Sequence, residues 1–214
     1  MAKIEPDKKS LKKILVVGND TYYQIPIYQR PYQWDKEQCE ELLNDLFENY
    51  EDHGEDDYFC GSLVFIQSDK DNKTDVVDGQ QRLSTFILLA KVLATLYSER
   101  LDPMIQEYLQ ESWSDRHEDG KKKKRERLDF DLVGSNAKKD FQEALDFFDD
   151  LDASKGEGSK SNDPSKGKNS YLKNAICLKN YLEKKRLKTL MISFNGFILR
   201  SISSPSPALI STWH

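Results

Sequence analysis

The sequence lacks the features of several familiar protein classes. It has three cysteines, and their odd number and wide spacing fit neither a disulfide framework nor a set of metal ligands. No window approaches the roughly 18 consecutive apolar residues that a membrane-spanning helix needs. The charged first ten residues contain no apolar stretch typical of a signal peptide. We therefore expect a soluble cytoplasmic protein with no membrane partner.

The chain carries no net positive charge, and its apolar residues are scarce. The formal net charge is −5, which gives no general attraction to nucleic acid. Hydrophobic residues make up 37% of the chain, below the usual share of about 45–50%. The charge is unevenly placed, because residues 35–58 are acidic whereas 121–127 and 160–188 are basic. These basic stretches are either solvated surface or local phosphate contacts.

The N-terminal pattern predicts a short helix, a turn at Gly18 and an extended segment. Residues 23–28 form a strand in this interpretation. Pro26 and Pro31 place that strand at a sheet edge or in irregular structure, because proline cannot donate to a sheet ladder.

Further predicted strands and helices follow along the chain. Asp35 and Gln38 predict a capping box at the start of an amphipathic helix. The apolar run 58–67 and the residues 75–77 predict a hairpin. The apolar helix that follows Gly79 is expected to lie at the centre of the core.

We predict a core domain at 1–112 and a helical extension at 113–190. Within the extension, residues 153–170 have the low-complexity composition of a flexible loop, and a helix follows at 171–188. Residues 191–214 show no usable periodicity, and we expect a disordered or truncated tail.

The stretch VVDGQQRLSTF contains a polar turn, residues 78–82, between a strand and a helix. One interpretation is structural: Asp78 caps the helix, Gln81 completes a capping box and Gly79 permits the sharp turn. Arg82 is then an exposed helix residue.

The alternative is an anion site at the positive end of the helix dipole. Gly79 would let a phosphate approach the backbone, and Arg82 would bind it with a bidentate fork. Gln80 or Gln81 would orient a water, and Asp78 would hold Mg²⁺ or polarise that water. No Gly-Lys-Ser/Thr follows, so this is not a Walker A loop.

A second cluster, IPIYQRPYQW at residues 25–34, is called the arm below. In a structural interpretation its aromatic residues, Tyr28, Tyr32 and Trp34, pack in the core and Arg30 pairs with an acidic residue. In a functional one the prolines stiffen a segment that presents Gln29, Arg30 and aromatic faces to a nucleotide or base.

The motifs IPIYQRPYQW, YFCGSLVFI and VVDGQQRLSTFILLAKVL, in this order and spacing, resemble the N-terminal domain of GmrSD-type restriction enzymes, also called domain of unknown function 262. The resemblance extends from about Leu11 to Tyr97. It implies an α/β (α+β) fold: a ParB- and sulfiredoxin-like core with a small mixed sheet and packed helices, followed by a helical segment. It also implies a modification-dependent restriction or phage-defence system. It also implies that a nucleoside triphosphate (GTP, CTP or ATP) with Mg²⁺ is bound and hydrolysed, and that this is coupled to recognition of DNA.

Carried over by motif, the residues fall into two predicted sets. The catalytic set is Asp78, Gln80 and Gln81. The cofactor-binding set is Gly79, Arg82, Ser84, Tyr28, Gln29 and Arg30.

One feature departs from the family pattern. The three histidines, His53, His117 and His214, are scattered and do not form the His-Asn-His nuclease constellation. We therefore expect no nuclease activity from this chain alone. The expected partners are a nucleotide, DNA such as modified phage DNA, a nuclease domain or subunit outside this chain and, in a homo-oligomer, further copies of it. The alternatives are a non-catalytic DNA-binding or partner-docking module, and a kinase-like or ParB-like enzyme that uses the same turn.

Overall fold

The computed structural model describes residue 7 and the ranges 9–15, 22–53, 59–67, 73–115, 125–131, 136–153 and 168–184. Its helices are α1 (Leu11–Leu15), α2 (Lys36–His53), α3 (Gln80–Leu96), α4 (Pro103–Glu111), α5 (Asn136–Ala153) and α6 (Ser170–Lys184). Its strands are β1 (Tyr22–Ile25), β2 (Val64–Gln67), β3 (Lys73–Asp78), β4 (Ser114–Asp115), β5 (Arg125–Glu126) and β6 (Leu128–Phe130).

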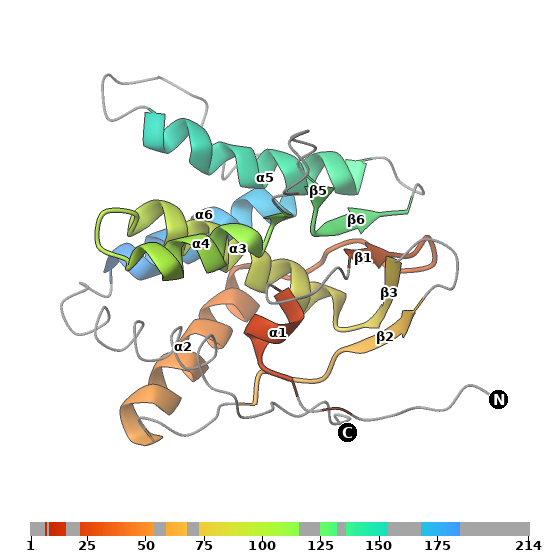
Figure 1. Cartoon of the computed structure of the whole chain (residues 1–214), viewed down its shortest axis with the longest axis horizontal. Coiled ribbons are helices and arrows are strands. Elements are labelled where there is room, and N and C mark those ends of the chain that lie inside the picture. Colours follow the sequence, from red (N-terminus) through yellow and green to blue (C-terminus); the bar gives the residue numbers. More distant parts are fainter. Residues whose placement is uncertain are drawn as a thin grey trace.

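Four strands form a mixed sheet in the order β2-β3-β1-β6. Strand β1 runs parallel to both β3 and β6, whereas β2 is antiparallel to β3. Figure 1 shows these strands gathered on the right, with α3, α4 and α6 to their left, α5 above and α2 below. The predicted α/β class with a small mixed sheet and packed helices is confirmed.

The sequence predicts that the first strand lies at a sheet edge or in irregular structure. The edge position is wrong, because β1 lies inside the sheet between β3 and β6. The strand ends at Ile25, so Pro26 follows it and needs no ladder hydrogen bond. The carbonyl of Pro26 instead accepts a 3.0 Å hydrogen bond from the backbone N–H of Gln29 and closes a turn. Proline therefore terminates this strand and leaves both of its edges paired.

Two local predictions are confirmed. The Asp35 side chain accepts from the backbone N–H of Glu37 at 2.9 Å, and Gln38 accepts from the N–H of Asp35 at 2.9 Å, which is a capping box. Strands β2 and β3 form the predicted hairpin. Strand β2 begins at Val64 and is shorter than the apolar run 58–67. Gly61 adopts φ 99° and interrupts the extended conformation before it.

Helix α3 lies at the centre of the core, as predicted, and it is buried on almost all sides. It packs against α4, α5 and α6, and α6 also packs against α2. A helix that is apolar around most of its circumference needs such partners on every face. Segments from both sides of residue 112 therefore share one sheet and one core. The division at that residue stays a prediction about the wider domain organisation.

The basic stretch 121–127, interpreted above as solvated surface or as phosphate contacts, is buried at its last residue. Arg127 is only 2% exposed, and its guanidinium lies over the ring of Tyr22 at 5.6 Å. Its Nε donates to the carbonyl of Glu111 at 3.4 Å. The Arg127 side chain therefore links α4 to β1 and is not free to contact phosphate.

Several predictions fall partly or wholly outside the described residues. Helix α5 extends to Ala153 and α6 begins at Ser170, so the predicted loop is described only at its ends. The predicted tail 191–214 lies outside the described residues. Among the helices that the structure describes, none combines the length and the apolar composition of a membrane span.

Asp129 of β6 links the sheet to α5. Its carboxylate accepts from Nζ of Lys138 at 2.8 Å and from Nζ of Lys73 at 3.3 Å. Burial alone would raise the pKa of Asp129, but the hydrogen bonds from Lys138, the Phe130 backbone and Lys73 outweigh it and lower the pKa from its ordinary 3.8. A carboxyl with a lowered folded-state pKa stabilises the fold above its unfolded pKa, and this contribution is lost as the pH falls through the folded value.

We therefore expect Asp129→Asn to flatten the acid limb of the stability curve. Between about pH 4 and 2, its free energy of unfolding should fall less steeply with decreasing pH than that of the wild type. Urea titrations across this range measure the slope. Asp52→Asn, at an exposed aspartate near the end of α2, is the control and should keep the wild-type slope. An equally steep slope for Asp129→Asn would contradict this role.

Candidate functional site

The polar turn 78–82 does not use the predicted capping box. The N-cap of α3 is Gly79, which adopts φ 84° in the left-handed region, and no side chain caps the helix. Asp78 is instead the exposed last residue of β3. Glycine is required here, because a Cβ on Gly79 would lie 2.3 Å from Cδ2 of Leu63 and 2.9 Å from the carbonyl oxygen of Ser62.

The side chain of Gln81 binds the arm and does not cap α3. Its Oε1 accepts from the backbone N–H of Gln33 at 2.8 Å and from that of Trp34 at 3.2 Å. Its Nε2 donates to the carbonyl of Pro31 at 3.2 Å. One buried amide therefore satisfies three backbone groups of a segment that has no strand partner.

Gln80 and Gln29 complete this attachment from both sides. Nε2 of Gln80 donates to the carbonyl of Arg30 at 2.7 Å and to Oε1 of Gln29 at 3.1 Å. Nε2 of Gln29 donates to the carbonyls of Val77 at 2.6 Å and Val76 at 3.2 Å. We call Gln29, Gln80 and Gln81 the glutamine clamp. It fastens the arm to the end of β3 and the start of α3.

Arg82 is half-buried, in contrast to the exposed position expected from the structural interpretation. One guanidinium nitrogen, Nη2, donates to the carbonyl of Ser62. The guanidinium lies against Gly61, where a Cβ would be 2.9 Å from Nε. That Nε is buried and has no hydrogen-bond partner among the described residues. Burial raises the pKa of the neighbouring Cys60 to about 12, and the charge of Arg82 opposes this shift.

Tyr32 follows the structural interpretation of the arm. Its ring stacks on Tyr171 with centroids 4.2 Å apart, and its hydroxyl lies 2.7 Å from Oγ1 of Thr85. Burial is the main cause that raises the pKa of the Tyr32 hydroxyl, so it stays protonated. Ser84 is only 1% exposed, and its Oγ is buried without a hydrogen-bond partner among the described residues. The structure therefore places neither Tyr32 nor Ser84 among the exposed groups.

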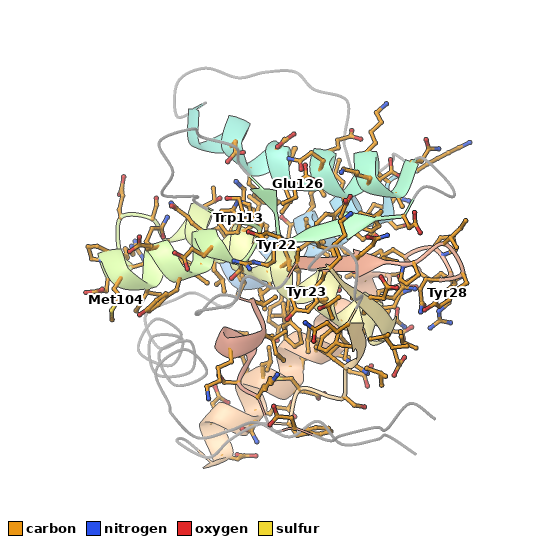
Figure 2. All side chains as sticks on the ribbon, turned by 45° about the vertical axis from the view of Figure 1, so that its right-hand side comes forward. Tyr22, Tyr23, Tyr28, Met104, Trp113 and Glu126 are labelled. Carbon is orange, nitrogen blue, oxygen red and sulfur yellow. The ribbon has the colours of Figure 1, made fainter. Side chains whose placement is uncertain are left out.

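The exposed members of the two motifs gather beyond the carboxyl ends of β1 and β3. Tyr28 is 65% exposed, and Figure 2 shows it projecting at the margin of the molecule, on the side opposite Met104. Arg30 and Asp78 are also exposed. The glutamine clamp joins the two backbone segments that carry them, at the carbonyls of Val77 and Arg30.

Asp131 lies at the same edge of the sheet and is not among the site residues predicted from the sequence. It follows β6, which is also parallel to β1, and its N–H donates to the carbonyl of Ile25 at 2.8 Å. We call Tyr28, Arg30, Asp78 and Asp131 the carboxyl-end surface. Ligands of open α/β sheets bind outside the carboxyl ends of parallel strands.

One comparison with known proteins decides the family. A model of the GmrSD restriction endonuclease N-terminal domain matches residues 11–206. The chain belongs to this family. No curated protein matches the chain. The family match extends well beyond the Leu11–Tyr97 region of motif resemblance and includes α5 and α6.

The next feature is the set of side chains that could bind a metal ion. Within the described ranges, no group of three or more His, Cys, Asp or Glu side chains could bind a metal ion. Mg²⁺ in nucleotide sites is commonly held by one or two carboxylates together with substrate phosphates. The exposed carboxylate of Asp78 fits that smaller requirement.

Two further residues of the site were not predicted. Gly61 supplies the close approach that Arg82 needs, and a glycine inside an otherwise continuous β-branched and aromatic run was the available signal. Asn174 of α6 donates to the carbonyl of Trp34 at 2.6 Å and to the hydroxyl of Tyr32 at 3.0 Å. Its signal was a polar residue within the apolar stripe of a predicted helix.

We expect Gly61→Ala to destabilise the chain by about 1–3 kcal/mol, because the φ of +99° is strained for alanine and the new methyl group meets Arg82. Chemical denaturation measures the loss. In an Arg82→Ala background the steric conflict is absent, so the same change should cost less. Equal costs in the two backgrounds would contradict the close packing of Arg82 on Gly61.

Proposed function

We propose that this GmrSD-family domain binds a nucleoside triphosphate with Mg²⁺ at the carboxyl-end surface and serves a restriction system that acts on DNA. One observation carries the proposal: the glutamine clamp holds the exposed Tyr28 and Arg30 beside the exposed Asp78, next to the start of α3. A cation, an aromatic ring and a carboxylate are thus carried by two backbone segments that the clamp joins. These are the groups that recognise phosphate, base and Mg²⁺.

Arg30 is the residue best suited to a phosphate. Its side chain is exposed and forms no ion pair among the described residues, so binding an anion breaks no existing contact. Its backbone carbonyl is fixed by Gln80. The neighbouring N-terminus of α3 adds a favourable electrostatic field for negative charge. Arg82 is a second candidate. One of its nitrogens binds Ser62 and its unpaired Nε is buried, so the side chain would have to move to reach a phosphate.

Mg²⁺ would supply charge neutralisation of the phosphates, and Asp78 would hold it. We further propose hydrolysis, with Gln80 or Gln81 as the residue that orients a water. Both amides are engaged with the arm in this structure. Orienting a water would therefore require release of at least one of these contacts. Nucleotide binding would thus use the glutamine clamp with its contacts intact, whereas hydrolysis would require one of them to open.

We propose that DNA cleavage depends on a nuclease domain or subunit outside this chain. The observation behind this is the absence of a paired-histidine motif in the sequence. Incubation of the purified chain with modified and plain phage DNA, in Mg²⁺ or Mn²⁺, should give no cleavage. Specific cleavage by the purified chain would overturn this part of the proposal.

Removal of Arg30 should weaken nucleotide binding. We expect Arg30→Ala to cost about 1.5–3 kcal/mol of binding free energy, the scale of a charge-assisted hydrogen bond. Arg82→Ala should have an effect of the same sign. Calorimetric titration with GTP, CTP and ATP analogues and Mg²⁺ measures the affinities and the base preference.

The matched control is Lys184→Ala, which removes one positive charge from an exposed position in the last turn of α6. It should leave the affinity unchanged. No binding by the folded wild type, or equal affinities for wild type and Arg30→Ala, would contradict the proposed site. The non-catalytic DNA-binding or docking module would then be the better interpretation.

A further inference from the structure

We propose that Asn174 of α6 is a positioning residue that holds the arm against the start of α3, so that the helical segment controls the carboxyl-end surface. The inference rests on the proposed function for its consequence at the nucleotide. The contacts themselves do not depend on that function. Asn174 lies outside both of the motifs that define the site.

The contacts of Asn174 are directed at the arm. The residue is 2% exposed, and Nδ2 uses both of its protons: one goes to the carbonyl of Trp34 at 2.6 Å and the other to the hydroxyl of Tyr32 at 3.0 Å. Tyr171, one turn earlier on α6, stacks on the ring of Tyr32. One face of α6 therefore contacts the arm at successive turns.

These hydrogen bonds continue into α3 and close a circuit. The hydroxyl of Tyr32 lies 2.7 Å from Oγ1 of Thr85, and that Oγ1 donates to the carbonyl of Gln81 at 2.8 Å. The side chain of Gln81 in turn accepts from the N–H of Trp34. The donors run in one direction, from Asn174 through Tyr32 and Thr85 to Gln81, and such chains strengthen cooperatively.

Trp34 is consequently held from two sides. Its N–H donates to the side chain of Gln81 on α3, and its carbonyl accepts from Asn174 on α6. Loss of Asn174 would leave that carbonyl without its buried partner, which favours local opening of this end of the arm. Tyr28 and Arg30 are exposed and have little packing of their own, so their placement depends on the backbone that follows them.

An apolar residue at 174 would be the simpler choice for packing. The buried neighbours on this face of α6 are Ala175, Leu178 and Leu182, and a buried amide costs free energy unless it is fully hydrogen-bonded. Both hydrogen bonds of the Asn174 amide nitrogen go to the arm. We infer that this amide fixes one arm conformation out of several that an apolar contact would allow.

The test compares Asn174→Leu, which keeps the side-chain size and removes both donors, with Lys173→Leu at the exposed neighbouring position. Hydrogen exchange detected by NMR is followed for the backbone amides of Gln33 and Trp34 in nucleotide-free protein. We expect Asn174→Leu to speed their exchange about fivefold to thirtyfold, the equilibrium factor that corresponds to about 1–2 kcal/mol of local stability. Core amides of α5 should exchange at the wild-type rate, and Lys173→Leu should change neither set.

A second comparison separates the circuit from simple packing. Thr85→Val interrupts the circuit on α3, where no direct hydrogen bond to Asn174 is made. If the circuit acts as a unit, Thr85→Val should also speed exchange at Gln33 and Trp34, and the double variant should add little. Multiplicative rates in the double variant, or acceleration spread evenly over the arm and α5, would overturn the positioning role.

Nucleotide titration of the same samples keeps the two proposals apart. Asn174→Leu should weaken binding of Mg²⁺ and GTP, because a smaller fraction of the chain holds the arm in place. Binding by the wild type with unchanged exchange in Asn174→Leu would overturn the positioning role alone. Selective exchange without any nucleotide binding by the wild type would overturn the proposed function alone.

Discussion

The structure depends on how an irregular segment is fastened where regular hydrogen bonding stops. The arm leaves β1 at Pro26 and crosses the start of α3 without a strand partner, so its backbone groups must find partners elsewhere. Glutamine suits this task because one side chain carries both a donor and an acceptor. Gln81 uses both at once, on Pro31 and on the N–H groups of Gln33 and Trp34. The DGQQR motif is thus a structural attachment as well as a candidate site.

This attachment explains why buried and exposed residues alternate so sharply in the arm. Gln29 and Tyr32 turn inward and are held by hydrogen bonds, whereas Tyr28 and Arg30 remain in solvent. Two glycines in the left-handed region, Gly61 and Gly79, let the loop before β2 pack closely beside the same junction. Exposed side chains on a firmly held backbone are well placed for binding, because little order remains to be imposed when a ligand arrives.

Patterns of neighbouring residues predicted much of this fold. Contacts between residues far apart in the sequence could not be predicted. The capping box at Asp35 and the hairpin of β2 and β3 follow from neighbouring residues and are confirmed. The capping box at Asp78 had an equally good local pattern. It is wrong because Gly79 is the N-cap residue. The side chain of Gln81 binds the arm, about fifty residues away in sequence, and does not cap the helix. Asn174 contacts Trp34 across 140 residues. A polar residue in an apolar stripe marks Asn174 as unusual, but a single sequence does not identify its partner. The predicted roles of the 78–82 turn in catalysis stay predictions.

The central claim is that the glutamine clamp presents the carboxyl-end surface to a nucleotide. The most direct measurement is an NMR titration of the labelled chain with a non-hydrolysable nucleoside triphosphate and Mg²⁺, following each backbone amide. The account predicts saturable shifts concentrated at residues 27–31 and 78–82, with smaller ones near Asp131. Shifts concentrated on α4 or α5, or none in a folded chain, would contradict it.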